Sequence, residues 1–119
     1  MYNVVHSNFA HNNGTDPNNP WGCGIVFWYT SNNLAYNNIL SANKYCGIQL
    51  RHGNKIYNNT IYANESRGIV LGSNVIDAQI INNIIYQSGQ PAIDDRGTNT
   101  VISHNLETNP QFVSRLIFI

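Results

Sequence analysis

The sequence predicts an all-β protein that winds as a solenoid, with three short strands in each coil. Three observations predict this class. Apolar residues occur in runs of two or three separated by asparagine, which fits neither a helical period nor a hairpin. Asparagine is abundant, at 21 of 119 residues, and it alternates with Ile, Val, Leu and Tyr, which argues against a disordered tract. Finally, one pattern recurs at intervals of 21 to 24 residues, which is typical of repeat architectures.

The repeats follow one another along the chain. The first copy begins at residues 4–12, is interrupted, and resumes at residues 21–27. Three full copies follow at residues 35–50, 56–71 and 80–95, and a partial copy at residues 101–109. A full copy reads apolar, any residue, Asn-Asn, any residue, apolar, and then a Gly or Ala followed by Ile. Successive copies stacked about 4.8 Å apart predict a right-handed parallel β-helix of about four to five coils.

Three apolar columns are expected to face the core. They are Val4, Ala35, Ile56, Ile80 and Val101; then Phe9, Leu40, Ile61, Ile85 and Leu106; and then Ile25, Ile48, Ile69 and Ile93. Because neighbouring side chains on a strand face opposite sides, a fourth column points outward: Val5, Tyr36, Tyr57, Ile81 and Ile102. A contiguous apolar stripe on a surface predicts a contact with another subunit.

Asparagine is expected at the corners for two reasons. It tolerates the left-handed backbone conformation that a sharp turn needs, and stacked amides can form hydrogen-bonded ladders. The candidate ladders are Asn37, Asn58 and Asn82, then Asn38, Asn59 and Asn83, with Asn43 and Asn64 at the next corner. Ser7 and His104 replace asparagine in the outer coils, as expected of atypical terminal repeats.

These repeats resemble those of the right-handed parallel β-helix, pectate-lyase-like superfamily, and residues 105–113 resemble an element that closes many secreted members. The resemblance implies a β-helix domain over residues 1–114, with an insertion at 12–20, followed by an apolar tail at 115–119. Members usually have more coils, a capping helix and an export signal, whereas residues 1–14 lack the features of a signal peptide. The chain is therefore expected to be a fragment of a larger polysaccharide-associated protein or a minimal relative, and its compartment is left open.

The acidic residues offer one cluster, Asp94-Asp95-Arg96. The resemblance implies lyases that hold calcium with carboxylates and use Arg or Lys as the base, or hydrolases that use clustered aspartates. Asp95 falls in the column of Phe27, Leu50 and Leu71, where a carboxylate is costly unless it is paired or the strand ends. One interpretation is a strand end at which Asp95 pairs with Arg96 or caps the turn. The other is a catalytic or calcium site formed with Asp77 and Arg51.

The aromatic residues favour a different function. The residues Trp21, Trp28, Tyr29, Tyr45 and Arg51 are expected to gather near the insertion. Flat aromatic faces stack on sugar rings while polar groups bond to hydroxyls, so these residues predict a carbohydrate site. The alternative is that the aromatic rings pack beneath the insertion. The favoured function is thus a non-catalytic module that binds carbohydrate or self-assembles, and the alternative is a polysaccharide lyase or hydrolase.

Cysteine and histidine carry no predicted chemistry. Cys23 and Cys46 align one coil apart, within disulfide range, but Arg67 and Pro91 share their column, which favours a corner position and free thiols. The four histidines show no metal-ligand spacing.

Charge and hydropathy limit the partners. Six basic and six acidic residues give a net charge of zero, with no basic patch for nucleic acid and no run long enough to span a membrane. The tail residues Leu116 and Phe118, together with Tyr36, Tyr57, Ile81 and Ile102, need cover from water, which predicts a homodimer.

Overall fold

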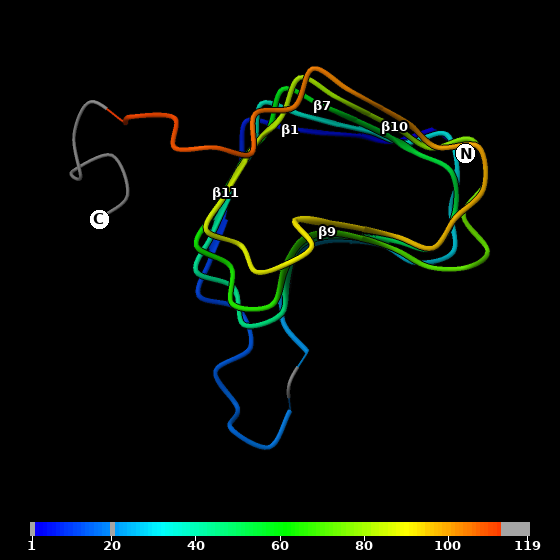
Figure 1. Cartoon of the computed structure of the whole chain (residues 1–119). Coiled ribbons are helices and arrows are strands. Elements are labelled where there is room, and N and C mark those ends of the chain that lie inside the picture. The colour runs from blue at the N-terminus through cyan, green and yellow to red at the C-terminus, as the bar shows by residue number, and fades with distance from the viewer. Residues whose placement is uncertain (1, 20, 113–119) are drawn as a thin grey trace.

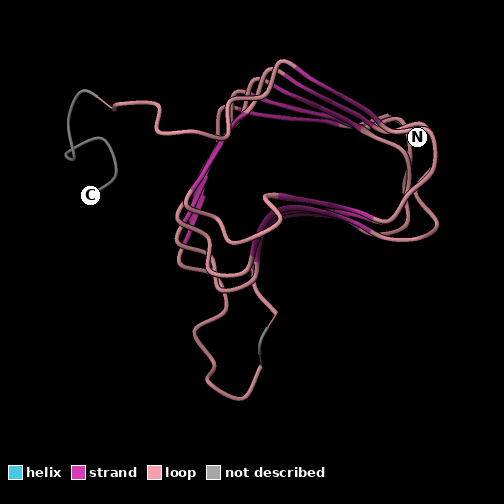
Figure 2. Ribbon diagram, in the orientation of Figure 1, coloured by secondary structure: helices cyan, strands magenta, loops and turns pink. Residues whose placement is uncertain are grey.

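The computed structural model describes residues 2–19 and 21–112, which form thirteen strands and no helix (Figure 2). Every strand pairing is parallel, and the strands stack into three sheets around about four coils. The predicted all-β solenoid with three strands per coil is therefore confirmed. Viewed along its axis, the chain traces superimposed coils with a hollow outline that side chains fill (Figure 1). None of the described residues forms a helix that is long and apolar enough to cross a membrane.

Each sheet takes one strand from successive coils. Sheet A contains β1 (Val4–His6), β4 (Leu34–Tyr36), β7 (Lys55–Tyr57), β10 (Gln79–Ile81) and β13 (Val101–Ser103). Sheet B contains β2 (Phe9–His11), β5 (Ile39–Ser41), β8 (Thr60–Tyr62) and β11 (Ile84–Tyr86). Sheet C contains β3 (Cys23–Phe27), β6 (Cys46–Leu50), β9 (Arg67–Leu71) and β12 (Ile93–Asp95).

The predicted inward columns are correct in the middle coils and shifted by one residue in the outer ones. The first column is Val5, Ala35, Ile56, Ile80 and Ile102, so Val4 and Val101 were placed wrongly. In the second column, Ala10 and not Phe9 aligns with Leu40, Ile61 and Ile85. Leu106 aligns with Ile84 and not with Ile85, so it lies outside this column. The third column, from Ile25 to Ile93, is confirmed. A shift of one residue turns a side chain to the opposite face, so Val4, Phe9, Val101 and Leu106 are exposed.

In each Asn-Asn pair, one asparagine adopts the left-handed turn conformation and the other forms the hydrogen-bonded ladder. The first of each pair adopts the left-handed conformation: φ is 55° at Asn37, 58° at Asn58 and 61° at Asn82. Ser7 and His104 do the same, with φ of 59° and 58°. The second of each pair is buried and forms the ladder. The predicted ladder through Asn37, Asn58 and Asn82 was therefore wrong, because those side chains lie outside the stack.

Three ladders run along the solenoid. In each, an asparagine donates from its backbone N–H and its Nδ2 to the Oδ1 of the next coil's asparagine. The longest ladder is Asn8, Asn38, Asn59, Asn83 and Asn105, with Nδ2–Oδ1 distances of 3.0 to 3.1 Å. The second is Asn13, Asn43 and Asn64, ending on the hydroxyl of Ser88. The third, Asn3, Asn33 and Asn54, was not predicted. The proposed ladder through Asn38, Asn59 and Asn83 is confirmed.

The insertion is shorter than expected. Asn13 belongs to a ladder, and Gly22 accepts a hydrogen bond from the N–H of Tyr45 at 2.8 Å. Asn13 and Gly22 are therefore part of the regular coil. The interruption comprises only residues 15–21. Its described residues, 15–19 and 21, project from the corner where sheet B meets sheet C (Figure 1). A Cβ built on Gly22 would lie 2.6 Å from Cα of Gly14, so the two ends of the interruption are in close contact.

The free thiols predicted for Cys23 and Cys46 were wrong, because the structure joins them in a disulfide between the first two coils. Their Cα atoms lie 4.6 Å apart, as parallel register at a corner dictates, and this is within the range that a disulfide spans. The bond ties the base of the insertion to the second coil.

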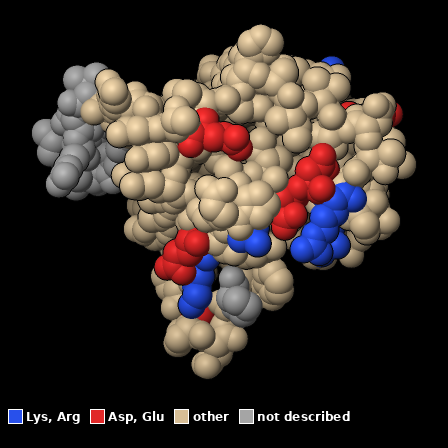
Figure 3. Space-filling view, viewed as in Figure 1, with Lys and Arg blue, Asp and Glu red and all other residues tan. Residues whose placement is uncertain are grey.

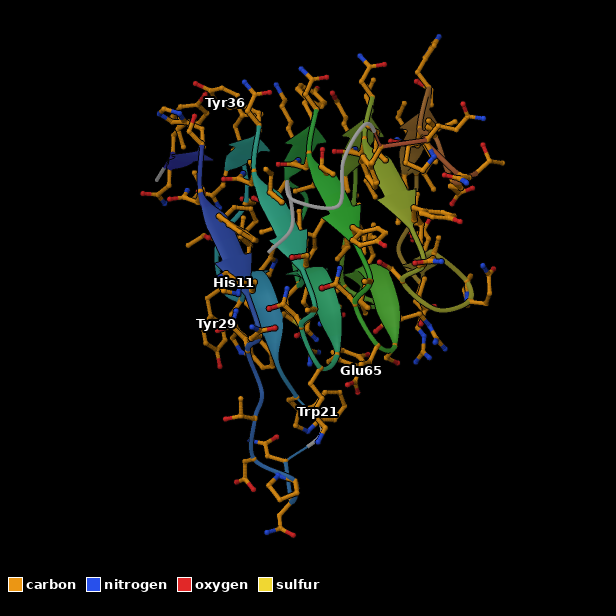
Figure 4. All side chains as sticks on the ribbon, turned by 90° about the vertical axis from the view of Figure 1, so that its left-hand side faces the viewer. His11, Trp21, Tyr29, Tyr36 and Glu65 are labelled. Carbon is orange, nitrogen blue, oxygen red and sulfur yellow. A yellow bond between two sulfur atoms is a disulfide. The ribbon has the colours of Figure 1, made fainter. Side chains whose placement is uncertain are left out.

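The outward stripe on sheet A also needs correction. Tyr36, Tyr57 and Ile81 do point outward and are half-buried, with His6 and Ser103 completing their column. Figure 4 shows Tyr36 at the top of the molecule. Val5 and Ile102 were assigned to this stripe wrongly, because they align with Ala35 and Ile80 in the inward column. Leu116 and Phe118, the other residues of the predicted interface, lie outside the described residues.

Candidate functional site

A groove of about 620 Å³ lies on the outer face of sheet C, and we call it the sheet-C groove. Its volume is within the range of small-molecule sites. Its lining residues come from β6, β9 and β12, from the segments that flank the strands of this sheet and from the end of the insertion: Trp21, Trp28, Tyr45, Gln49, Arg51, Val70, Leu71, Gly72, Asp94 and Arg96. A ligand lying along it would cross three steps between coils, or about 14 Å at the spacing of paired strands.

Strand alternation explains why these side chains reach the groove. Ile48 and Leu50 face the core, so Gln49 between them faces outward. Parallel register then aligns Val26, Gln49, Val70 and Asp94 in one outward column. Sheet C meets sheet B at a tight corner that requires glycine: a Cβ on Gly47 would lie 2.6 Å from Cγ2 of Ile61.

The aromatic residues form two pairs in the groove. The guanidinium carbon of Arg51 lies 4.3 Å from the ring centroid of Trp28, a cation–π geometry. Trp21 meets Tyr45 edge to face, with centroids 4.8 Å apart. These four residues, which the sequence predicted to gather, line one groove. Trp21 is 61% exposed and Trp28 is 42% exposed, so neither ring is packed away beneath the insertion.

Tyr29 lies apart from the groove. It is 83% exposed, and it borders a separate small hollow of about 130 Å³ with Trp28 and His52. Figure 4 places Tyr29 well away from Trp21, near the side of the first coil. Its ring meets that of Trp28 edge to face, with centroids 6.1 Å apart, and its predicted part in a carbohydrate site stays a prediction.

The acidic residues do not come together. Asp94 faces the groove, with Arg67 Nε at 3.6 Å and Arg96 Nε at 3.6 Å from its carboxylate oxygens. Asp95 turns away, ends β12 and caps the following turn by accepting from Gly97 N–H at 2.9 Å. Thus the turn-capping interpretation of Asp95 is correct, whereas the suggested Asp95–Arg96 pair is replaced by Asp94–Arg96.

Asp77 lies in the turn after β9, and its Oδ1 accepts from Asn99 Nδ2 at 2.6 Å. Among the described residues, no three His, Cys, Asp or Glu side chains are grouped to hold a metal. Calcium takes six to eight oxygen ligands, and both oxygens of Asp94 already face guanidinium groups. The described residues of the groove therefore do not fit the calcium ion that the resemblance to lyases implies.

Arg67 was not identified from the sequence as a site residue. Its Nη1 donates to the carbonyl of Ser66 at 2.7 Å. Its Nε is buried and, within the described part of the chain, has no hydrogen-bond partner; its nearest carboxylate is that of Asp94. The alignment with Cys23 and Cys46 placed Arg67 at a corner but gave no indication of this contact. On the face shown in Figure 3, acidic and basic atoms lie beside one another in two places on the lower half.

A second depression adjoins the first, and we call it the turn hollow. It has a volume of about 540 Å³ and lies over the turns between sheets B and C. Trp21 and Tyr45 line it as well as the groove, and its other lining residues are Lys44, Glu65, Ser66, Arg67, Gly89 and Gln90. Figure 4 shows Glu65 on the corner beside Trp21. The sequence did not reveal this hollow, because residues at the same corner of four successive coils create it.

Comparison with known proteins gives one match. The profile of a family described as "Right handed beta helix region" matches residues 1–108, which include all thirteen strands. No curated protein and no solved structure matches the chain. The match agrees with the predicted handedness of the coil, and the closer resemblance to pectate lyases stays a prediction.

Proposed function

Because the chain belongs to the right-handed β-helix family, we propose that its solenoid is a rigid support and that the sheet-C groove binds carbohydrate without reacting with it. The observation that carries this proposal is the presence of Trp21, Trp28 and Tyr45 in one groove with Gln49 and Arg51. Sugar rings have apolar faces and hydroxyl edges, and such a lining matches both.

The rigidity of the support favours binding. Gln49 projects from β6, which is paired on both sides, and Asp94 projects from β12, which is paired with β9 at the edge of the sheet. The buried columns lie beneath both strands. Trp28 is held by its contact with Arg51. Groups that are ordered before binding lose little entropy when a ligand arrives. A preformed groove of this kind suits an extended ligand that has both apolar faces and polar edges.

The alternative, a lyase or glycoside hydrolase, has one observation in its favour: Asp94 lies in the groove between two arginines. Glycoside hydrolysis generally needs a pair of carboxyl groups flanking the scissile bond. Among the described residues that line the groove, Asp94 supplies the sole carboxylate. Its ion pairs with Arg67 and Arg96 account for its position without a catalytic role, so binding is the better-supported function.

The test is a glycan array followed by calorimetry on the glycan that binds best. We expect Trp28→Ala to weaken binding about 10- to 30-fold, which corresponds to the ~1.4–2 kcal/mol of an aromatic anchor. Tyr2→Ala is the matched control, since Tyr2 is 64% exposed and lies outside the groove. Equal affinities for the two variants would contradict the proposal.

The same glycans serve to test catalysis. Samples incubated with the parent chain are assayed for unsaturated uronate by absorbance and for new reducing ends. We expect neither product with or without added calcium. Turnover that disappears in Asp94→Asn would establish the alternative function instead.

A further inference from the structure

The aromatic pair of Trp21 and Tyr45 borders two depressions at once. Both residues line the sheet-C groove and the turn hollow, so the two spaces adjoin across this pair. An edge-to-face contact covers at most one face of either ring. Trp21 therefore keeps at least one flat face that Tyr45 does not cover, at the junction between the two spaces.

Both depressions combine aromatic and charged groups. The groove has Trp28 with Arg51, Asp94 and Arg96, and the turn hollow has Lys44, Glu65 and Arg67 beside Trp21 and Tyr45. Arg67 lines the turn hollow and pairs with Asp94, which lines the groove. This ion pair forms a shared boundary, so one extended ligand could contact aromatic and charged groups in succession.

Trp21 reaches this junction on an element that the coil does not need. Lys44 N–H donates to the carbonyl of Asn13 at 3.0 Å, and the next residue, Tyr45, donates to Gly22. Two consecutive residues of the second coil thus pair with residues on either side of the interruption. Without residues 15–21, the first coil would have the same spacing from Ala10 to Cys23 as the second has from Leu40 to Cys46.

We propose that Trp21 joins the groove and the turn hollow into one extended site, and that residues 15–21 determine the length of carbohydrate chain that the protein prefers. The ligand class is a linear oligosaccharide long enough to lie in both depressions with a sugar ring against Trp21. This inference rests on the proposed function. Covalently linked sugars that occupy two adjoining subsites gain affinity through high effective concentration, whereas a short sugar fills only one.

The experiment measures affinity against chain length. The parent chain, Trp21→Ala, and a variant lacking residues 15–21 with Gly14 joined to Gly22 are titrated by calorimetry. The probes are oligogalacturonides and cello-oligosaccharides, each from the disaccharide to the octasaccharide or the longest soluble member. Tyr2→Ala is the control. Urea unfolding and quantification of free thiols show whether each variant keeps the coil and the Cys23–Cys46 bond.

For the parent chain, we expect affinity to rise with length by at least about tenfold before it levels off. Both altered proteins should lose the gain in affinity from longer chains, whereas Tyr2→Ala should keep it. If the deletion variant does not fold, Trp21→Ala alone decides the matter. A length dependence that is unchanged in Trp21→Ala overturns the inference and leaves the proposed function intact. Failure of the parent chain to bind either series overturns both.

Discussion

Replacing Asn59 by alanine is expected to lower the free energy of unfolding by about 3 to 5 kcal/mol. The buried amide of Asn59 takes part in five hydrogen bonds. Its Oδ1 accepts from the backbone N–H and the Nδ2 of Asn38, both at 3.0 Å. Its Nδ2 contacts the oxygens of Asn83, Ala35 and Tyr57 at 3.0 to 3.1 Å. Each hydrogen bond contributes about 1 kcal/mol to stability. The sum is somewhat below five times this value, because three acceptors share the two N–H groups of Nδ2.

Urea unfolding followed by circular dichroism measures the loss, with Asn18→Ala as the control. Asn18 is an exposed residue of the insertion, and such surface changes usually lie within about 0.5 kcal/mol. The loss of stability in Asn59→Ser should lie between those of Asn59→Ala and Asn18→Ala. A serine can serve in a ladder, because Ser88 Oγ accepts hydrogen bonds from the N–H and the Nδ2 of Asn64, both at 3.3 Å. If Asn59→Ala and Asn18→Ala unfold at the same urea concentration, the ladders do not stabilise the solenoid.

Four further outcomes are expected. Ile61→Ala should cost about 2 to 5 kcal/mol in urea unfolding, because Ile61 is fully buried; a loss below about 1 kcal/mol would contradict its place in the core. Gly47→Ala should destabilise the protein measurably by the same assay, since its Cβ would press on Ile61, and an unchanged midpoint would refute the tight corner. Reduction of Cys23–Cys46, separated by 23 residues, should lower stability by about 3 kcal/mol, as urea curves with and without dithiothreitol would measure. Light scattering should give a dimer for the full chain and a monomer after removal of residues 115–119, and a monomer in both cases would rule out the homodimer.

The sequence was sufficient to predict the middle of the solenoid. Ile56 lies between Lys55 and Tyr57, which leaves one choice of inward residue, and the repeat pattern aligns Ala35 and Ile80 with it. In the outer coils Val4 precedes Val5 and Val101 precedes Ile102, so hydrophobicity alone could not distinguish the faces. The ladder resolves them, because in sheet A the inward residue lies three positions before the stacked asparagine, as Ala35 does before Asn38.

The candidate site was predictable in part for a related reason. Alignment of the coils brings Trp28, Arg51 and Asp94 to one sheet, because parallel register carries a column from coil to coil. The turn hollow and the Arg67–Asp94 contact depend on the paths of turns and on side-chain rotamers, which the repeat pattern does not encode. The disulfide was missed because a corner column was taken to imply exposure, whereas Cys46 is fully buried.

The direction of the ladders has an electrostatic consequence for a chain whose net charge is zero. Backbone hydrogen bonds between coils run both ways: Asn37 N–H donates to Asn58 in the following coil, and Thr60 N–H donates to Asn38 in the preceding one. Such opposed dipoles largely cancel. The ladder carbonyls all point toward the preceding coil, since each Oδ1 accepts from the asparagine before it. An amide carries a dipole of about 3.5 D, and three parallel rows of them give the solenoid a polar axis whose negative end lies at its first coil.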